Sequence, residues 1–226
     1  MKEILQSLIP NVLNIKEELI LGIYQTLTMV TVSGTLSLVV GILLGVVLVV
    51  TRKNGILENT RLYAIIEKII NTFRSIPFVI LIALLIPVTR AIVGTAIGTK
   101  GAIVPLIFGT VPFLSRQIEN ALVEVDKGII EAAKSMGSSP LEIIFRVYLR
   151  EGLPGIIRGI TITFISLIGL TAIAGSVGGG GLGDLAIRYG YQRFQTDVTI
   201  VTVIILLILV SIVQAVGNFL IKKISH

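Results

Sequence analysis

Long stretches without any charged side chain dominate the hydropathy pattern of this chain. Residues 19–51, 159–183 and 198–221 contain no Asp, Glu, Lys or Arg. A helix needs about 20 predominantly apolar residues to cross the hydrocarbon core of a bilayer. Each stretch is at least that long, so the pattern predicts three membrane-spanning helices.

Two further apolar stretches lie in the middle of the chain and are less regular. Residues 75–98 are interrupted by Arg90, and residues 101–115 carry Pro105 and Pro112. Proline inside a membrane is tolerated where neighbouring protein satisfies the backbone groups that it frees. We expect two shorter spans here, and one long kinked helix with a re-entrant segment is the alternative. The five predicted spans cover residues 19–50, 75–97, 102–121, 157–178 and 198–221.

The first 18 residues differ from the spans because charged side chains break up their apolar positions. No signal-peptide core forms there, and the pattern is typical of a short amphipathic helix on the membrane surface. We expect residues 1–18 to be an interfacial segment and residues 19–226 to form one transmembrane domain.

The positive charges indicate an orientation. About two thirds of the 19 Lys and Arg residues fall in the segments on one side of the five spans, which is the cytoplasmic side by the positive-inside rule. The N-terminus is therefore expected outside and the C-terminus in the cytoplasm. This bias also explains the net charge of +6 without a nucleic-acid partner.

The amino-acid composition excludes several kinds of functional site. With 54% hydrophobic residues, 14% charged residues and a mean hydropathy of +0.96, the chain is predicted to be an all-α polytopic membrane protein, since soluble domains carry roughly 25% charged residues. It has no cysteine, and its one histidine is His226. Disulfides, thiolate metal sites and imidazole clusters are excluded. We predict no catalytic residue, no metal site and no cofactor.

The largest predicted cytoplasmic segment, residues 122–158, has the pattern of two helices joined by a tight turn. Helical spacing predicts two apolar stripes, Leu122, Val125, Ile129, Ala132, Ala133 and Met136, then Leu141, Ile144, Phe145, Tyr148 and Leu149. Gly137 follows the first stripe as a C′ glycine. Ser139, Pro140 and Glu142 form a capping-box pattern. We expect a compact knob that docks on the bundle and fits a partner, and an amphipathic loop resting on lipid is the alternative.

Small and polar residues predict how the spans pack. Helix-packing faces are indicated by small residues at fourfold spacing, Ser33, Ser37, Gly41 and Gly45, then Gly155 and Gly159 with Thr163. Gln214 and Asn218 lie one turn apart in the last span. Amides need partners in lipid, so we expect this face to look into the bundle.

Two glycine-rich stretches resemble nucleotide-binding motifs only formally. Residues 178–183 satisfy the spacing G-x-G-x-x-G, but no strand precedes them, so we expect a flexible extracytoplasmic turn and no dinucleotide site. Residues 94–100 lack the glycine spacing and the Ser or Thr of a phosphate-binding loop. The chain therefore has no predicted ATP site.

Several motifs resemble those of a known family. Glu131-Ala132-Ala133, with Gly137 four residues later, is similar to the EAA loop of the membrane subunits of bacterial ABC importers. Residues 71–78, 90–95 and 178–197 resemble the permease subunits of methionine importers. The similarity covers the chain from about residue 20 onward. One departure is that Leu149 is followed by Arg150 where the family has Leu-Pro. The second helix of the EAA segment is therefore expected to run on toward Pro154.

The resemblance implies a function. It makes the chain a permease subunit that imports methionine or a related amino acid across the inner membrane, as a homodimer with two cytoplasmic ATPase subunits and an extracytoplasmic methionine-binding protein. An ATP-independent channel or secondary transporter is the alternative, but such proteins place ionisable relays at mid-membrane, and the three charge-free spans have none. An intramembrane enzyme lacks a paired nucleophile and base.

The resemblance also assigns roles to residues. ATPase coupling is implied for Glu131, Ala132, Ala133, Gly137, Ser139, Pro140, Ile144 and Phe145. A contact with the binding protein is expected at Asp184, Arg188, Tyr191 and Arg193. The predicted translocation path carries the hydroxyl residues Thr161, Thr163, Ser166, Thr171 and Ser176. These hydroxyls are equally suited to bonding their own helix backbone.

Overall fold

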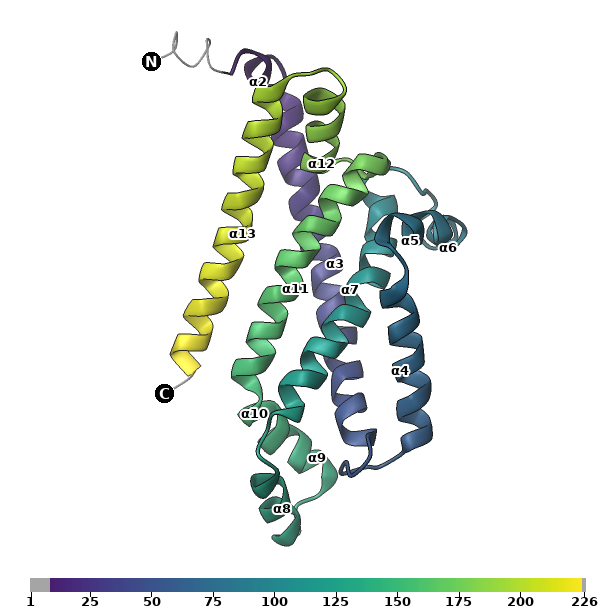
Figure 1. Cartoon of the computed structure of the whole chain (residues 1–226), viewed down its shortest axis with the longest axis vertical. Coiled ribbons are helices and arrows are strands. Elements are labelled where there is room, and N and C mark those ends of the chain that lie inside the picture. Colours follow the sequence, from purple (N-terminus) through teal and green to yellow (C-terminus); the bar gives the residue numbers. More distant parts are fainter. Residues whose placement is uncertain (1–8, 225–226) are drawn as a thin grey trace. The chain divides into compact units, whose positions relative to one another are not determined.

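The computed structural model describes residues 9–224, and this part of the chain is helical without any strand (Figure 1). Residues 1–8, which hold much of the predicted interfacial segment, lie outside the described part. From there the helices and π-helical segments (η) follow in the order α2 (Pro10–Asn14), α3 (Lys16–Thr51), α4 (Thr60–Ser75), α5 (Phe78–Leu84), α6 (Ile86–Val93), α7 (Gly98–Val123), α8 (Lys127–Ser135), α9 (Pro140–Glu142), η1 (Ile143–Tyr148), α10 (Leu149–Glu151), α11 (Leu153–Ala174), η2 (Gly175–Gly179), α12 (Gly181–Leu185), η3 (Ala186–Tyr191) and α13 (Thr196–Ile224).

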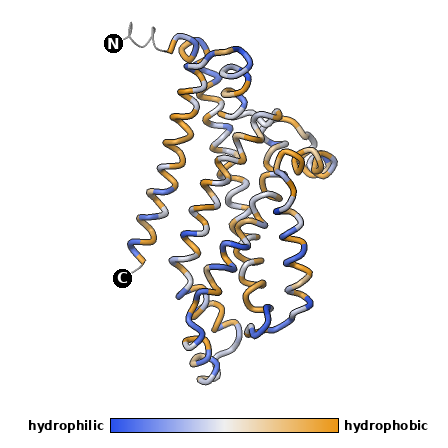
Figure 2. The backbone as a smooth tube through the Cα atoms, viewed as in Figure 1, coloured by the Kyte–Doolittle hydropathy of each residue, from blue (hydrophilic) through white to orange (hydrophobic). Residues whose placement is uncertain are grey.

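Four helices are long and apolar enough to cross a membrane. They are α3, α7, the stretch Leu153–Gly179 that joins α11 to η2, and α13. Three of them coincide with the charge-free stretches, and α7 coincides with the predicted proline-containing span 102–121. Hydrophobic positions run along these helices in Figure 2, as expected of segments whose surroundings are lipid or other apolar helices.

The second predicted span, residues 75–97, is wrong as a single helix. The chain forms two short helices there, α5 and α6, and α6 ends at Gly94 in a left-handed conformation with φ of 79°. A 16-residue helix, α4, precedes them. The pattern concealed α4 because Arg61, Glu67, Lys68 and Arg74 interrupt its apolar positions.

The chain divides into two compact units. The first unit contains the residues up to Thr35, Ile76–Gly109 and Phe164–Val213. Two hydrophobic clusters form its core, one around Met29, Leu106 and Leu167 and the other around Leu182 and Val198. The second unit contains Leu36–Ser75, Thr110–Thr163 and the residues from Gln214 onward, and one cluster around Val49, Ile118 and Tyr148 forms its core.

Small residues let the helices approach closely, as their spacing predicts. In the second unit, a Cβ added to Gly41 would lie 2.7 Å from the side chain of Leu114, and one added to Gly45 would lie 2.6 Å from Ile118. A Cβ on Gly159 would lie 2.9 Å from that of Gln117. The helix-packing faces predicted for these glycines are confirmed, since the space at each is already filled by a neighbouring helix.

The glycine-rich run of the first unit is a packed chain reversal, and the expectation of a flexible turn is wrong. Gly178, Gly180 and Gly181 have φ of 97°, 77° and 81°, which only glycine adopts without strain. The Gln25 side chain accepts a hydrogen bond from Gly181 N at 2.7 Å, and Thr26 Oγ1 accepts one from Leu182 N at 2.9 Å. The side chains of Gln25 and Thr26 in α3 thus accept hydrogen bonds from two backbone amides of the reversal, so the reversal can be buried.

We expect Gly183→Ala to destabilise the protein. Gly183 is buried, and a Cβ there would collide with the backbone carbonyl of Ala172, so the substitution should cost about 1–3 kcal/mol. Gly169→Ala is the matched control, because nothing lies within 4 Å of the Cβ that it adds. Thermal unfolding of the detergent-solubilised protein measures both, and equal midpoints for the two variants would contradict the packing.

Candidate functional site

The two predicted helices of the EAA region are present, and they form a bihelical segment, residues 127–151. Asp126 caps the first helix, α8, through a 2.6 Å hydrogen bond that its carboxylate accepts from Gly128 N. At the other end Gly137 has φ of 79°. The Ser138 amide donates to Ala133 O at 3.1 Å and the Gly137 amide to Lys134 O at 3.0 Å. This is the Schellman arrangement, which confirms Gly137 as the C′ residue.

The second helix begins at the predicted capping box. Ser139 Oγ accepts a hydrogen bond from Glu142 N, and the Glu142 carboxylate accepts one from Ser139 N at 2.9 Å. These hydrogen bonds from Ser139 favour the ionised carboxylate, so the pKa of Glu142 lies below its usual value. Because the folded-state pKa is lowered, the ionised carboxylate stabilises the folded protein fully at neutral pH. This stabilisation is lost only as the pH falls through the folded-state pKa.

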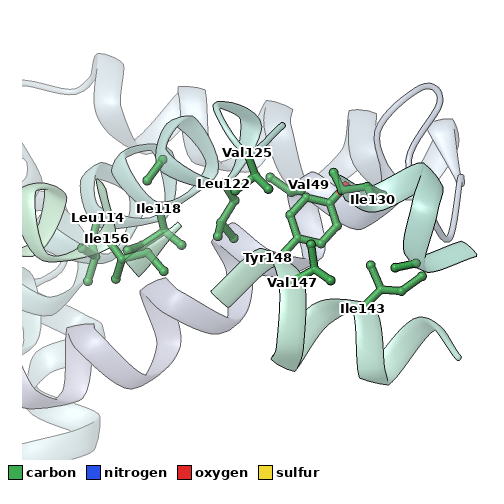
Figure 3. Close-up of a cluster of buried hydrophobic side chains, with 12 residues drawn as sticks. Val49, Leu114, Ile118, Leu122, Val125, Ile130, Ile143, Val147, Tyr148 and Ile156 are labelled. Carbon is green, nitrogen blue, oxygen red and sulfur yellow. The ribbon is translucent and has the colours of Figure 1, made fainter. Parts of the chain in front are cut away.

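One face of the bihelical segment is buried in the core of the second unit. Ile130, Ile143 and Val147 join residues of α3, α7 and α11 there, and the Tyr148 ring lies at the centre of these side chains (Figure 3). Burial raises the pKa of the Tyr148 hydroxyl. The segment is therefore anchored on the ends of the long helices by a continuous apolar contact.

The opposite face leaves large apolar side chains exposed. They are Ile129, Met136, Leu141 and Phe145. The predicted stripes are therefore correct only in part. Val125, Ala133 and Tyr148 are buried as predicted, whereas Ile129 and Met136 point away from the core. Ile130, Ile143 and Val147, which lie outside the stripes, also fill the core. The π-helical turn Ile143–Tyr148 shifts the register within the second helix, a local winding that a 3.6-residue period does not anticipate.

The residues assigned to ATPase coupling divide between the two faces. Glu131, Ala132 and Phe145 are exposed, as are Gly137, Ser139 and Pro140 of the turn. Ala133 and Ile144 are buried and cannot touch a partner. The helix continues past Arg150 to Glu151, and Gly152 separates it from α11. The helix thus runs past Arg150 as expected, but it ends at Glu151, before Pro154, which lies in the first turn of α11.

An ion cluster in the second unit joins α4 to α7 and was not foreseen. Arg116 Nη1 donates to the Glu119 carboxylate at 2.6 Å, and Arg116 Nη2 donates to Glu67 at 2.9 Å and to Asn71 at 3.1 Å. The Tyr63 hydroxyl donates to Glu119 at 3.1 Å. Glu119 is only 5% exposed. A buried carboxylate needs such partners, so the cluster is what allows the charged residues of α4 to pack against an apolar helix.

The hydroxyl residues proposed for the path lie on different faces of α11. Thr161, Thr163 and Thr171 each donate to a backbone carbonyl of their own helix, at 2.7–2.8 Å. Thr163 and Thr171 are also buried. Ser166 and Ser176 are exposed. Ser176 Oγ also donates to a carbonyl of its own helix, Ile173 O, at 2.8 Å. Four of these five hydroxyls therefore satisfy their own backbone, and Ser166 is the exposed one that does not.

The four residues expected to meet the binding protein cluster on η3 and next to it. Asp184 accepts two hydrogen bonds from the Arg188 guanidinium, at 2.8 and 3.1 Å, which raises the pKa of Arg188. Arg188 and Arg193 both lie over the Tyr189 ring, 4.8 and 4.5 Å from its centroid. Tyr191 is exposed and the neighbouring Phe194 is more exposed still. They form a charged and aromatic surface in the first unit.

The family model for the inner-membrane component of binding-protein-dependent transport systems matches residues 37–226. The chain belongs to this family. It is accordingly an inner-membrane transport component with several spans. Among residues 9–224, no group of three or more His, Cys, Asp and Glu side chains is arranged to hold a metal ion.

Individual members of the family are similar over most of their length. The probable D-methionine transport system permease protein of Vibrio cholerae is 49% identical over 208 residues, 92% of each chain. The corresponding protein of Salmonella typhimurium is 49% identical over 157 residues, 70% of this chain and 72% of the relative. A chain of the MetNI methionine ABC transporter in an inward-facing conformation matches with a TM-score of 0.92 at 43% identity, covering 94% of this chain and 99% of its own. A chain of an amino acid ABC transporter shares the fold, with a TM-score of 0.78 at 16% identity.

We expect Arg116→Gln to destabilise the second unit by about 3 kcal/mol, because it leaves the buried Glu119 carboxylate without its charge partner. The double variant Arg116→Gln/Glu119→Gln removes both charges and should recover most of that loss. Denaturant unfolding in detergent measures the two free energies. If the single and double variants unfold at the same denaturant concentration, the ion pair does not stabilise the α4–α7 contact.

Proposed function

We propose that this chain is the permease subunit of an ABC importer for methionine or a closely related amino acid. It works as a homodimer with two cytoplasmic ATPase subunits and receives its solute from an extracytoplasmic binding protein. The subunit itself is non-catalytic, and ATP hydrolysis takes place in the partner. The N-terminus lies outside and the C-terminus in the cytoplasm. The observation that carries the proposal is the bihelical segment, which is apolar on both faces but buried on only one.

The exposed face of this segment supports docking into an ATPase subunit. Met136 and Phe145 are 79% and 66% exposed, and large apolar side chains of this kind on a compact knob are typical of an interface. Glu131 and Ala132 lie on the same element and are also exposed. The buried face, centred on Tyr148, would transmit a displacement of the knob to α3, α7 and α11 because these side chains are close-packed.

An exposed face of α11 supports a solute path between two copies of the chain. Ser166, Gly169, Ile173 and Ser176 recur at spacings of three and four residues and are all exposed, so they share one side of the helix. Nothing lies within 4 Å of a Cβ added to Gly169. A second copy related by a two-fold axis would place the same face opposite, which is the simplest closed symmetry.

The surface of η3 supports delivery of the solute from outside. Arg188 and Arg193 are held beside Tyr189, and the exposed Tyr191 stands next to them. Aromatic and arginine side chains are the residues that contribute most at protein interfaces. We assign Asp184, Arg188, Tyr191 and Arg193 to the contact with the binding protein.

The experiment is reconstitution of the chain with the ATPase subunit of its own transport system in proteoliposomes. Phe145→Ala should lower the ATPase stimulation produced by the methionine-loaded binding protein about tenfold, because an aromatic anchor of the docking face is lost. Phe219→Ala is the matched control, since Phe219 is likewise 66% exposed but lies on α13. It should behave as wild type.

Two results would overturn the proposal. One is failure of the wild-type chain to purify with the ATPase subunit, which would favour an ATP-independent transporter. The other is full stimulation in Phe145→Ala vesicles, which would leave the exposed apolar face without a role in coupling. Uptake of radiolabelled candidate amino acids by the same vesicles identifies the solute.

A further inference from the structure

A second polar feature lies where α11 and α13 meet in the second unit. A Cβ added to Gly217 of α13 would collide with the side chain of Thr161 in α11. Thr161 is near the beginning of α11 and Gly217 near the end of α13. The two helices therefore touch at this point, and Figure 1 shows that α11 and α13 run in opposite directions.

The contact determines which side chains gather beside it. In an antiparallel pair, residues at equal sequence offsets from the contact fall on the same side of the pair. Arg158 lies three residues before Thr161, and Ile162 lies one residue after it. Likewise, Gln214 lies three residues before Gly217, and Asn218 lies one residue after it. All four are therefore on one side. At 1.5 Å rise per residue, Arg158 and Asn218 are about 3 Å apart along the helix axes.

These side chains are exposed and have no partners of their own. Arg158, Gln214 and Asn218 are all exposed, and within residues 9–224 none of them makes a side-chain hydrogen bond or an ion pair. The expectation that the two amides look into the bundle is therefore wrong. Figure 2 shows hydrophilic positions interrupting the C-terminal part of α13. A guanidinium and two amides on a helix pair are too costly to face lipid, so this side must meet water or a polar ligand.

We propose that Arg158, Gln214 and Asn218 bind the carboxylate of the transported amino acid at the inner end of its path. This rests on the proposed function. A guanidinium donates two parallel hydrogen bonds to a carboxylate, and each amide supplies a further donor. Ile162 is exposed on the same side and offers an apolar contact to the solute side chain. Arg158 is the only charge among the four, so the site is complementary to a single negative charge.

The phosphate of a phospholipid headgroup offers the same oxyanion chemistry. Lys222 and Lys223 in the last turn of α13 would favour an anionic headgroup near this end of the helix. The offsets from Thr161 and Gly217, however, group Arg158 with neutral amides and an isoleucine, which is a pattern suited to a small amino acid. The two sources are separated by the lipid composition of the bilayer and by the chemistry of the solute.

The test is direct binding of radiolabelled methionine to the complete complex of permease and ATPase subunits, without binding protein, in nanodiscs of neutral phosphatidylcholine. We expect Arg158→Gln to weaken binding at least about tenfold, since it removes a charge-assisted pair of hydrogen bonds. Gln214→Leu, which is close in size and keeps an exposed position of α13 apolar in lipid, should weaken it less. Arg61→Gln is the control, because Arg61 is an exposed basic residue of α4, and it should bind as wild type.

Methionine amide, which lacks the carboxylate, supplies the second arm. Wild type should bind it more weakly than methionine, and Arg158→Gln should bind the two solutes equally.

The inference is overturned by equal methionine affinity in wild type, Arg158→Gln and Gln214→Leu, or by no measurable binding to wild type. It is also overturned if the effect of Arg158→Gln appears only in discs containing phosphatidylglycerol, which would indicate a headgroup site. If wild-type vesicles take up methionine while Arg158→Gln and Gln214→Leu bind it with normal affinity, this inference alone is refuted. If wild-type vesicles show no ATP-driven uptake, the proposed function is refuted.

Discussion

The burial of Tyr148 and its apolar neighbours is the contact on which the rest of the mechanism depends. Through it the bihelical segment becomes part of the hydrophobic core of the second unit, together with the ends of α3, α7 and α11. Close-packed side chains cannot be compressed or separated cheaply. A partner that displaces the exposed face must therefore move the helix ends with it, and this is the physical requirement for coupling an ATPase to a set of transmembrane helices.

Two groups of polar side chains in the described part of the protein have a clear structural explanation. Arg116, Glu67 and Glu119 neutralise one another between α4 and α7. Gln25 and Thr26 satisfy amides that the glycine-rich reversal frees. Arg158 and the amides of α13 differ from these groups, because they lie together at an exposed surface and are not paired within the described chain. In a membrane protein such a group marks a ligand or a water-filled passage, since lipid offers it no hydrogen bond.

The sequence predictions were most accurate for features that depend on interactions between residues close together in the chain. The C′ glycine at 137 and the capping box at Ser139 were predicted correctly, because each depends on atoms within a few residues. The long spans were predicted equally well, since the hydrocarbon thickness imposes a minimum apolar length. The buried face of the bihelical segment was predicted only in part, since Ala133 and Tyr148 are buried but Ile129 and Met136 are exposed. Its phase depends on the π-helical turn at Ile143–Tyr148 and on which long helices receive it.

By itself, the sequence determined that this is an all-helical membrane protein, where its long helices begin and end, and that two capped helices interrupt them. Those features arise from local hydrogen bonding and from the solvent that surrounds each segment. Only the tertiary structure decided that α4 packs against α7 through an ion cluster and that Arg158 shares a surface with Gln214 and Asn218. These outcomes depend on which helix faces meet across more than 40 residues of chain, and neither hydropathy nor periodicity carries that information.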